Sequence, residues 1–152
     1  MQATFFTLTL QDRRSDLLIR KIKELRIAFH RVMKTYPFTI DGIVVLPEHV
    51  HMSMTLPSDD INYSQRISFI KSAFSLQLEL MEFINSSRQS KRERGIWQRR
   101  FWEHLIRDEQ DYERHLDLIQ QTAKTLAKVS LEAIPFSKGY YSRKRSIFFL
   151  TK

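Results

Sequence analysis

Two histidines stand two residues apart, His49 and His51, in the run PEHVHMSMTLP. The alternation of a β-strand would send both imidazoles to one face of a sheet and Val50 to the other. Two imidazoles on one face can share a divalent ion, and a metal there would polarise a phosphodiester oxygen. An HxH pair alone is more often a pair of ordinary surface or strand-end histidines. The pair is therefore a candidate metal site that needs support from the rest of the chain.

A second candidate site is the basic segment RQSKRERGIWQRR, which carries six Lys or Arg and one Glu and leads into an aromatic run. Cations for phosphates, interleaved with flat rings on which bases can stack, are typical of single-stranded nucleic-acid binding. The alternative is that the rings are core residues of a strand and the arginines belong to a solvated loop. The candidate DNA-binding residues are Arg92, Arg94, Trp97, Arg99, Arg100 and Trp102.

Other histidines are weaker candidates. His104 and His115 could each supply a third metal ligand, but single histidines near helix ends are more often packing or capping groups. His30 reads as part of a helix surface.

Composition favours a polyanionic partner. The 152 residues include 25 Lys and Arg against 17 Asp and Glu, so the net charge is +8 and the pI is about 9.9. Nucleic acid is favoured over a membrane, because no run approaches the roughly 18 apolar residues of a spanning helix. A basic but unspecialised soluble protein is the alternative. The absence of cysteine excludes thiolate chemistry, and the first residues lack a signal-peptide pattern, so we expect a cytoplasmic protein.

Hydrophobic periodicity supplies the elements that must position these residues. The expected strands are 4–10, 38–46, 49–56 and 97–105, with the second and third joined as a hairpin through Pro47 and Glu48. The expected helices run from Ser15 to before Pro37, over 63–84 and over 109–128, the last capped by Asp108. This order predicts an α+β, ferredoxin-like split βαβ antiparallel sheet with an additional C-terminal helix. We expect one domain over residues 4–129 and a divergent basic tail over 130–152, for which we favour disorder.

Four segments carry a resemblance to a known family. FFTLTLQDRRSDLL, FTIDGIVVLPEHVHMSMTLP, ISFIKSAFS and RERGIWQRRFWEHLIRDEQDYERHLD resemble the REP-associated tyrosine transposases, which belong to the HUH single-strand transposases of small bacterial insertion sequences. The resemblance covers about residues 4–117. It implies a ferredoxin-like fold in which the His49–His51 pair binds Mg²⁺ or Mn²⁺ at the scissile phosphate.

The resemblance also implies a reaction and a partner. A tyrosine on the late helix displaces a 3′ hydroxyl, a 5′-phosphotyrosine is held, and a second DNA end reverses the step. The implied partner is single-stranded or palindromic hairpin DNA, bound largely through a basic surface by a monomer or homodimer.

The chain departs from the family at the nucleophile. The family pattern is Tyr-Ile-His-x-Asn-Pro, whereas residues 118–123 of this chain read Leu-Ile-Gln-Gln-Thr-Ala. Leu118 therefore stands at the tyrosine position, and Thr122 stands where a further metal ligand is expected. Tyr112 lies six residues earlier on another side of the helix, and Tyr140 and Tyr141 lie in the unmatched tail. A reading-frame shift near Gln121 would explain the tail but not Leu118, so two lesions would be needed, which suggests decay or repurposing.

Three functions remain open from the sequence. One is an active enzyme that nicks and rejoins single-stranded DNA, and another is a non-catalytic hairpin DNA-binding module derived from a transposase. A third is a metal-dependent hydrolase that uses water as its nucleophile. Such a site requires more acidic ligands than the sequence places near His49 and His51. We expect a transposase-like DNA-binding protein whose catalysis is impaired by the absence of the tyrosine.

Overall fold

The chain folds around one mixed sheet, with strand order β4-β1-β3-β2-β6-β5. The computed structural model describes residues 2–125, 129–130 and 146–150. The strands are β1 (Ala3–Thr9), β2 (Thr39–Val45), β3 (His49–Thr55), β4 (Trp102–Leu105), β5 (Val129–Ser130) and β6 (Ser146–Leu150). The helices are α1 (Leu17–Arg20), α2 (Ile22–Thr35), α3 (Tyr63–Ser75), α4 (Ser86–Ser90) and α5 (Glu109–Thr125).

The first four strands confirm the expected fold class. β1 is antiparallel to β3 and β4, and β2 is antiparallel to β3, so β4-β1-β3-β2 is the four-stranded antiparallel sheet of the split βαβ arrangement. β6 then joins β2 in parallel, and β5 pairs with β6. Residues 131–145 of the expected tail lie outside the described residues, and the division at residue 130 stays a prediction.

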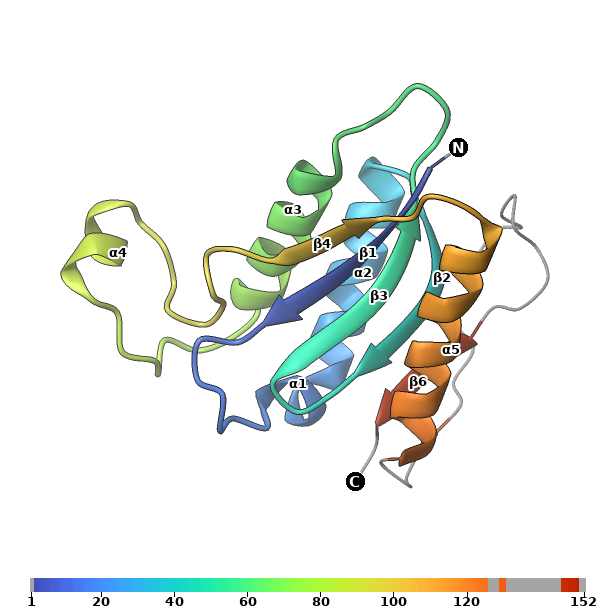
Figure 1. Ribbon diagram of the computed structural model, residues 1–152. Coiled ribbons are helices and arrows are strands. Elements are labelled where there is room, and N and C mark those ends of the chain that lie inside the picture. The colour runs from blue at the N-terminus through green and yellow to red at the C-terminus, as the bar shows by residue number, and fades with distance from the viewer. Residues whose placement is uncertain (1, 126–128, 131–145, 151–152) are drawn as a thin grey trace.

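Helices cover the two faces of the sheet unequally (Figure 1). α2 and α3 lie on one face, where Phe6, Leu8, Met52 and Phe74 belong to the larger apolar core, and α5 lies on the other. The smaller cluster under α5 includes Phe5. Successive residues of a strand face opposite sides, so a single strand supplies both clusters.

The second long helix, expected over 63–84, is shorter than its periodicity predicts, so the predicted C-terminal end was wrong. It ends at Ser75 rather than at residue 84, and Met81 is 83% exposed. The cause lies far along the chain, in Arg94. Its guanidinium donates to the carbonyl oxygens of Ser75, at 2.7 Å, Leu78, at 3.2 Å, and Glu79, at 2.9 Å, and it forms an ion pair with Glu82. These carbonyls are thus satisfied without further helical turns.

Two other boundaries also differ from the expectation. The first helix is interrupted at Lys21, which separates α1 from α2. The last strand of the four begins at Trp102 rather than at Trp97, because the preceding basic segment forms α4 and a loop. Among the described residues, no helix has the length and apolar character needed to cross a bilayer.

Arg94 can be tested as the residue that holds the end of α3. We expect Arg94→Gln to lower the free energy of unfolding by about 2–4 kcal/mol, because several hydrogen bonds from a charged donor are lost and Glu82 is left unpaired. Chemical denaturation measures the change. Arg92→Gln, at an exposed position two residues earlier, is the matched control and should leave stability within about 0.5 kcal/mol. Equal effects of the two substitutions would contradict this role of Arg94.

Candidate metal centre

The histidine pair lies on the central strand of the antiparallel part of the sheet. In β3, His51 is opposite Thr7 of β1 on one side and Val44 of β2 on the other. His49 and His51 project to the face covered by α5, while Val50 and Met52 enter the core on the opposite face. The Nε2 atoms of the two histidines are 3.2 Å apart.

Each imidazole is oriented through its other nitrogen. His49 Nδ1 is 2.7 Å from Glu48 Oε1, and His51 Nδ1 is 2.8 Å from Thr7 Oγ1. Where both Nδ1 atoms carry the proton and donate it, both Nε2 lone pairs are free and face one another. Hydrogen bonds of this kind fix the ring orientation of metal-bound histidines.

The separation of the two Nε2 atoms is compatible with one shared divalent ion. Imidazole nitrogens bind Zn²⁺, for example, at roughly 2.0–2.1 Å, so two of them on one such ion lie about 3.0–3.4 Å apart. The separation of 3.2 Å falls in this range. Burial, with a smaller contribution from the neighbouring His49, lowers the pKa of His51 from 6.5 to about 4. His51 is therefore a neutral imidazole at pH 7, which is the form that binds metals.

The turn before the strand holds Glu48 in place. The amide of Leu10 donates to the Glu48 carbonyl oxygen at 2.8 Å, and the amide of Leu18 donates to that of Pro47 at 3.2 Å. The Glu48 side chain, which is 18% exposed, also lies 3.5 Å from the guanidinium of Arg13. Glu48 and Thr7 were not among the residues singled out in the sequence, although Glu48 directly precedes the histidine that it contacts.

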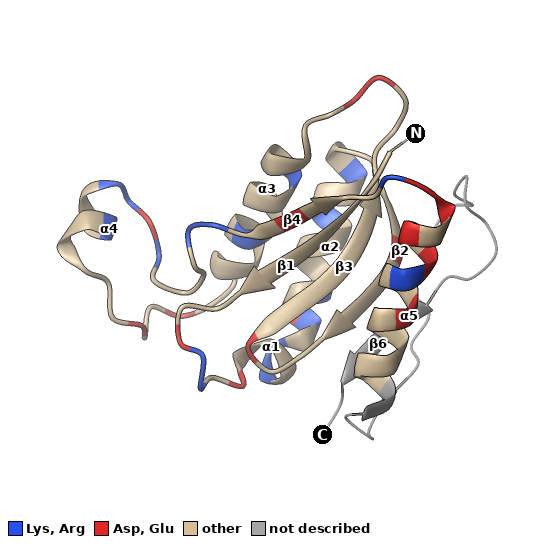
Figure 2. Ribbon diagram, viewed as in Figure 1, with Lys and Arg blue, Asp and Glu red and all other residues tan. Residues whose placement is uncertain are grey.

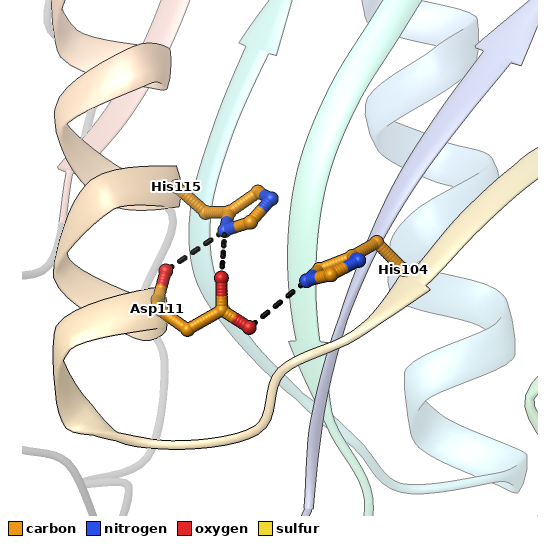
Figure 3. A group of neighbouring side chains, drawn as sticks. All are labelled: His104, Asp111 and His115. Carbon is orange, nitrogen blue, oxygen red and sulfur yellow. Dashed lines mark hydrogen bonds and ion pairs between the residues drawn. The ribbon is translucent and has the colours of Figure 1, made fainter.

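A second group of ligand-type side chains joins β4 to α5 (Figure 3). His104 Nε2 lies 2.9 Å from Asp111 Oδ2, and His115 Nδ1 lies 2.8 Å from the Asp111 carbonyl oxygen and 3.3 Å from Oδ1. The two imidazoles are stacked, with ring centroids 4.7 Å apart. One ligand atom from each of the three residues lies within 4.8 Å of the others, so the group could hold a divalent ion in place of these hydrogen bonds.

Asp111 is the centre of this group. Its side chain is 4% exposed, and Oδ2 also accepts the amide of Arg107 at 3.0 Å. This backbone hydrogen bond, followed by the one from His104, lowers the pKa of Asp111 from 3.8 to about 2. The amide of Asp111 donates to Asp108 Oδ1 at 2.8 Å, which confirms the predicted cap of this helix. The i,i+4 spacing of Asp111 and His115 is the sequence signal that could have identified the group.

An aromatic ring connects the two groups. Phe5 lies between them, with its ring centroid 5.7 Å from that of His51 and 4.8 Å from that of His115. Figure 1 shows α5 running from the end of β3 toward the end at which β3 begins. The turn of α5 that follows His115 therefore advances along the sheet in the direction of the His49–His51 pair.

That turn carries Leu118, the position of the family tyrosine in the resemblance. Residues 111, 115, 118 and 122 share one side of the helix because their spacing follows its turns. Leu118 is 47% exposed, and Thr122 Oγ1 donates to the Leu118 carbonyl oxygen at 2.7 Å. Tyr112 is 3% exposed in the apolar cluster under α5. Tyr140 and Tyr141 lie outside the described residues.

The basic segment divides into inward and outward residues. Trp97 is 5% exposed and packs against Phe74, and Arg94 is engaged with the end of α3. Arg92, Arg99 and Arg100 are exposed, and Arg99 pairs with Glu93 at 2.8 Å. Trp102 is 53% exposed and lies in β4 opposite Thr7. Lys and Arg colour the α4 region and the segment that leads into β4 in Figure 2.

Comparisons with known proteins identify relatives over most of the chain. A Haemophilus influenzae protein named as a REP-associated tyrosine transposase is 50% identical over 117 residues, 76% of this chain and 66% of its own. The Escherichia coli REP-associated tyrosine transposase is 42% identical over 115 residues, 76% of this chain and 62% of its own. The match thus spans slightly less than two thirds of these curated relatives. No protein-family model matches the chain.

Solved structures agree with the sequence relatives. A REP-associated tyrosine transposase bound to a REP hairpin superposes with a TM-score of 0.68 at 37% identity, covering 83% of this chain and 68% of the other. A transposase from Deinococcus radiodurans superposes with a TM-score of 0.51 at 11% identity, over 82% of this chain and 91% of the other, which shows the fold alone.

The buried carboxylate of Asp111, which contacts both stacked histidines, should make stability depend on acid. Because the pKa of folded Asp111 lies below its unfolded value, its stabilising effect is complete above about pH 4 and is lost as the pH falls toward 2. Asp111→Asn should lower the melting temperature at pH 7 by several degrees and flatten its decline below pH 4. Melting curves measured between pH 2 and 7 would show this. Asp117→Asn, at an exposed position of the same helix, is the control, and identical profiles for both variants would contradict the assignment.

Proposed function

Because the chain belongs to the REP-associated tyrosine transposase family, we propose that it binds hairpin or single-stranded DNA as a transposase-like protein of the nicking and rejoining type, with its strand cleavage impaired. The proposal places a Mg²⁺ or Mn²⁺ ion on His49 and His51. The observation that carries it is the pair of Nε2 atoms 3.2 Å apart, each ring oriented by a hydrogen bond at its other nitrogen.

The chain's own residues account for binding and orientation at this site. Glu48 and Thr7 hold the two imidazoles with their Nε2 atoms toward one side. A divalent ion held there would supply the positive charge that polarises a phosphodiester oxygen. Its donors are two neutral nitrogens, so a carboxylate, water or phosphate oxygen would complete the coordination.

The impairment follows from the side chains on the α5 turn beyond His115. Leu118 has no nucleophilic atom, and the Thr122 hydroxyl is hydrogen-bonded to the backbone of its own helix. The buried phenol of Tyr112 is a poor substitute because its ring belongs to the apolar cluster under α5. Binding without efficient cleavage is the function that these residues support.

The proposed DNA partner rests on the basic surface and on a relative. The relative of solved structure is bound to a REP hairpin. In β1, Thr7 pairs with His51 of β3 on one side and with Trp102 of β4 on the other. The exposed indole of Trp102 therefore lies near the candidate metal centre. An exposed ring beside a metal site is suited to stacking an unpaired base. The exposed Arg92, Arg99 and Arg100 would contact backbone phosphates.

Metal binding is tested by removing one ligand and one orienting group. His51→Ala should abolish the Mn²⁺ binding of the His49–His51 pair in isothermal titration calorimetry, since one nitrogen cannot replace the pair, and should leave any binding by the separate group of His104, Asp111 and His115 unchanged. Thr7→Val should weaken it by about tenfold, because the ring loses its orienting partner but keeps its ligand atom. His30→Ala, an exposed helix histidine, is the control and should bind as the unmodified chain does. Mn²⁺ binding that survives His51→Ala unchanged would disprove this site.

The impaired nucleophile is tested by restoring the family residue. We expect the unmodified chain to bind hairpin DNA with a single-stranded flank and to form no covalent adduct in Mn²⁺. Leu118→Tyr should form a small amount of adduct, visible as a shifted band in a denaturing gel, because it supplies a phenol at the position of the family tyrosine. Leu118→Phe supplies the ring without the hydroxyl and should form none. An adduct formed by the unmodified chain would overturn the proposed impairment.

A further inference from the structure

A cavity of about 460 Å³ lies between α3 and the basic segment that follows α4. It is lined by Lys71 and Ser75 of α3 and by Arg88, Arg92, Trp97 and Arg99. α3 covers the face of the sheet opposite to that of α5, so the cavity is separate from the metal centre. Its volume is that of a site for a small ligand or for one group of a larger one.

Two of its cations are withdrawn from solvent without a carboxylate partner. Arg88 is 8% exposed, and its guanidinium donates to the Arg94 carbonyl oxygen at 2.8 Å and to Gln11 Oε1 at 3.1 Å. Lys71 is half-buried, and its Nζ donates to the Gln98 carbonyl oxygen at 2.9 Å. Among the residues that the structure describes, neither forms an ion pair. Neutral acceptors leave both positive charges uncompensated.

The remaining charges of the cavity offset this excess of positive charge only in part. Glu93, the acid among its lining residues, pairs with Arg99 at 2.8 Å, and the charge of Arg88 also contributes to lowering the pKa of its carboxyl. Arg92 is exposed at the rim and has no ion pair within the described part of the chain. Burial, followed by the charge of Arg88, lowers the pKa of Lys71 to about 8. Two positive groups that disfavour one another at close range become favourable neighbours when an anion lies between them.

A buried indole also forms part of the wall of the cavity. Trp97 is 5% exposed, and its buried Nε1–H has no acceptor among the described residues. The cation positions are also fixed, since Arg88 is held by two bonds and Lys71 lies 5.5 Å from the centre of the Phe101 ring.

We propose that this cavity binds a phosphate group through Lys71 and Arg88. Under the proposed function, on which this step rests, the group is a backbone phosphodiester of the DNA, at a point remote from the metal centre. A phosphate offers several acceptor oxygens and at least one negative charge, which match two cations. The cavity would then fix the position of the DNA on the protein without reading its sequence.

The DNA arm of the test measures affinity for hairpin DNA with a single-stranded flank across a range of salt concentrations. We expect Lys71→Gln to weaken binding severalfold and to make the slope of log affinity against log salt less steep by about one. Lys71→Arg should keep most of the affinity. Lys34→Gln, an exposed lysine of α2, is the control of equal charge change and should alter neither quantity measurably. Melting curves of all variants show whether they fold.

The second arm uses inorganic phosphate alone. Phosphate at constant ionic strength should raise the melting temperature of the unmodified chain and of Lys34→Gln, but not that of Lys71→Gln. If the chain binds hairpin DNA and Lys71→Gln behaves like Lys34→Gln in both arms, the cavity proposal is overturned and the proposed function stands. If the chain binds no hairpin DNA but phosphate stabilises it through Lys71, the proposed function fails and the site takes phosphate from another source. If neither the affinity for hairpin DNA nor the stabilisation by phosphate depends on Lys71, the phosphate site is rejected.

Discussion

The register of β3 is the constraint on which the site depends. This strand is paired on both sides, so its position along the sheet is fixed by β1 and β2 together. A slip of one residue would turn His49 and His51 into the apolar core and bring Val50 and Met52 to the opposite face. Burying two imidazoles without partners while exposing apolar side chains would be strongly unfavourable. The same packing that stabilises the sheet therefore keeps the two imidazoles together on one face.

Local pattern was sufficient for the features set by neighbouring residues. The alternation around Val50 predicted the shared face of the histidines, and Asp108 was correctly expected to cap the last long helix. The end of α3 was not predictable in this way, because Arg94 lies 19 residues beyond Ser75, whose carbonyl oxygen it binds. The periodicity that extended the helix was real, but a distant side chain satisfied the same backbone groups by another route.

The site shows a similar division between local and distant information. The histidine pair could be identified from three consecutive residues, whereas its orienting group Thr7 comes from another strand, 44 residues away in sequence. The basic segment looked like one functional unit, but Arg94 and Trp97 are turned inward and Arg92 and Trp102 outward. Composition predicts that such a segment carries charge and rings. Only the fold decides which of them remain available to a ligand.

The exposure of Leu118 has an evolutionary consequence. Nearly half of its side chain lies in solvent, and the apolar contacts that attach α5 to the sheet come from other positions, including Leu116 and Ile119. Selection for a stable fold therefore exerts little control over residue 118, and only selection for chemistry would preserve a particular side chain there. A lineage could lose its nucleophile while its sheet, its histidine pair and its basic surface remain intact.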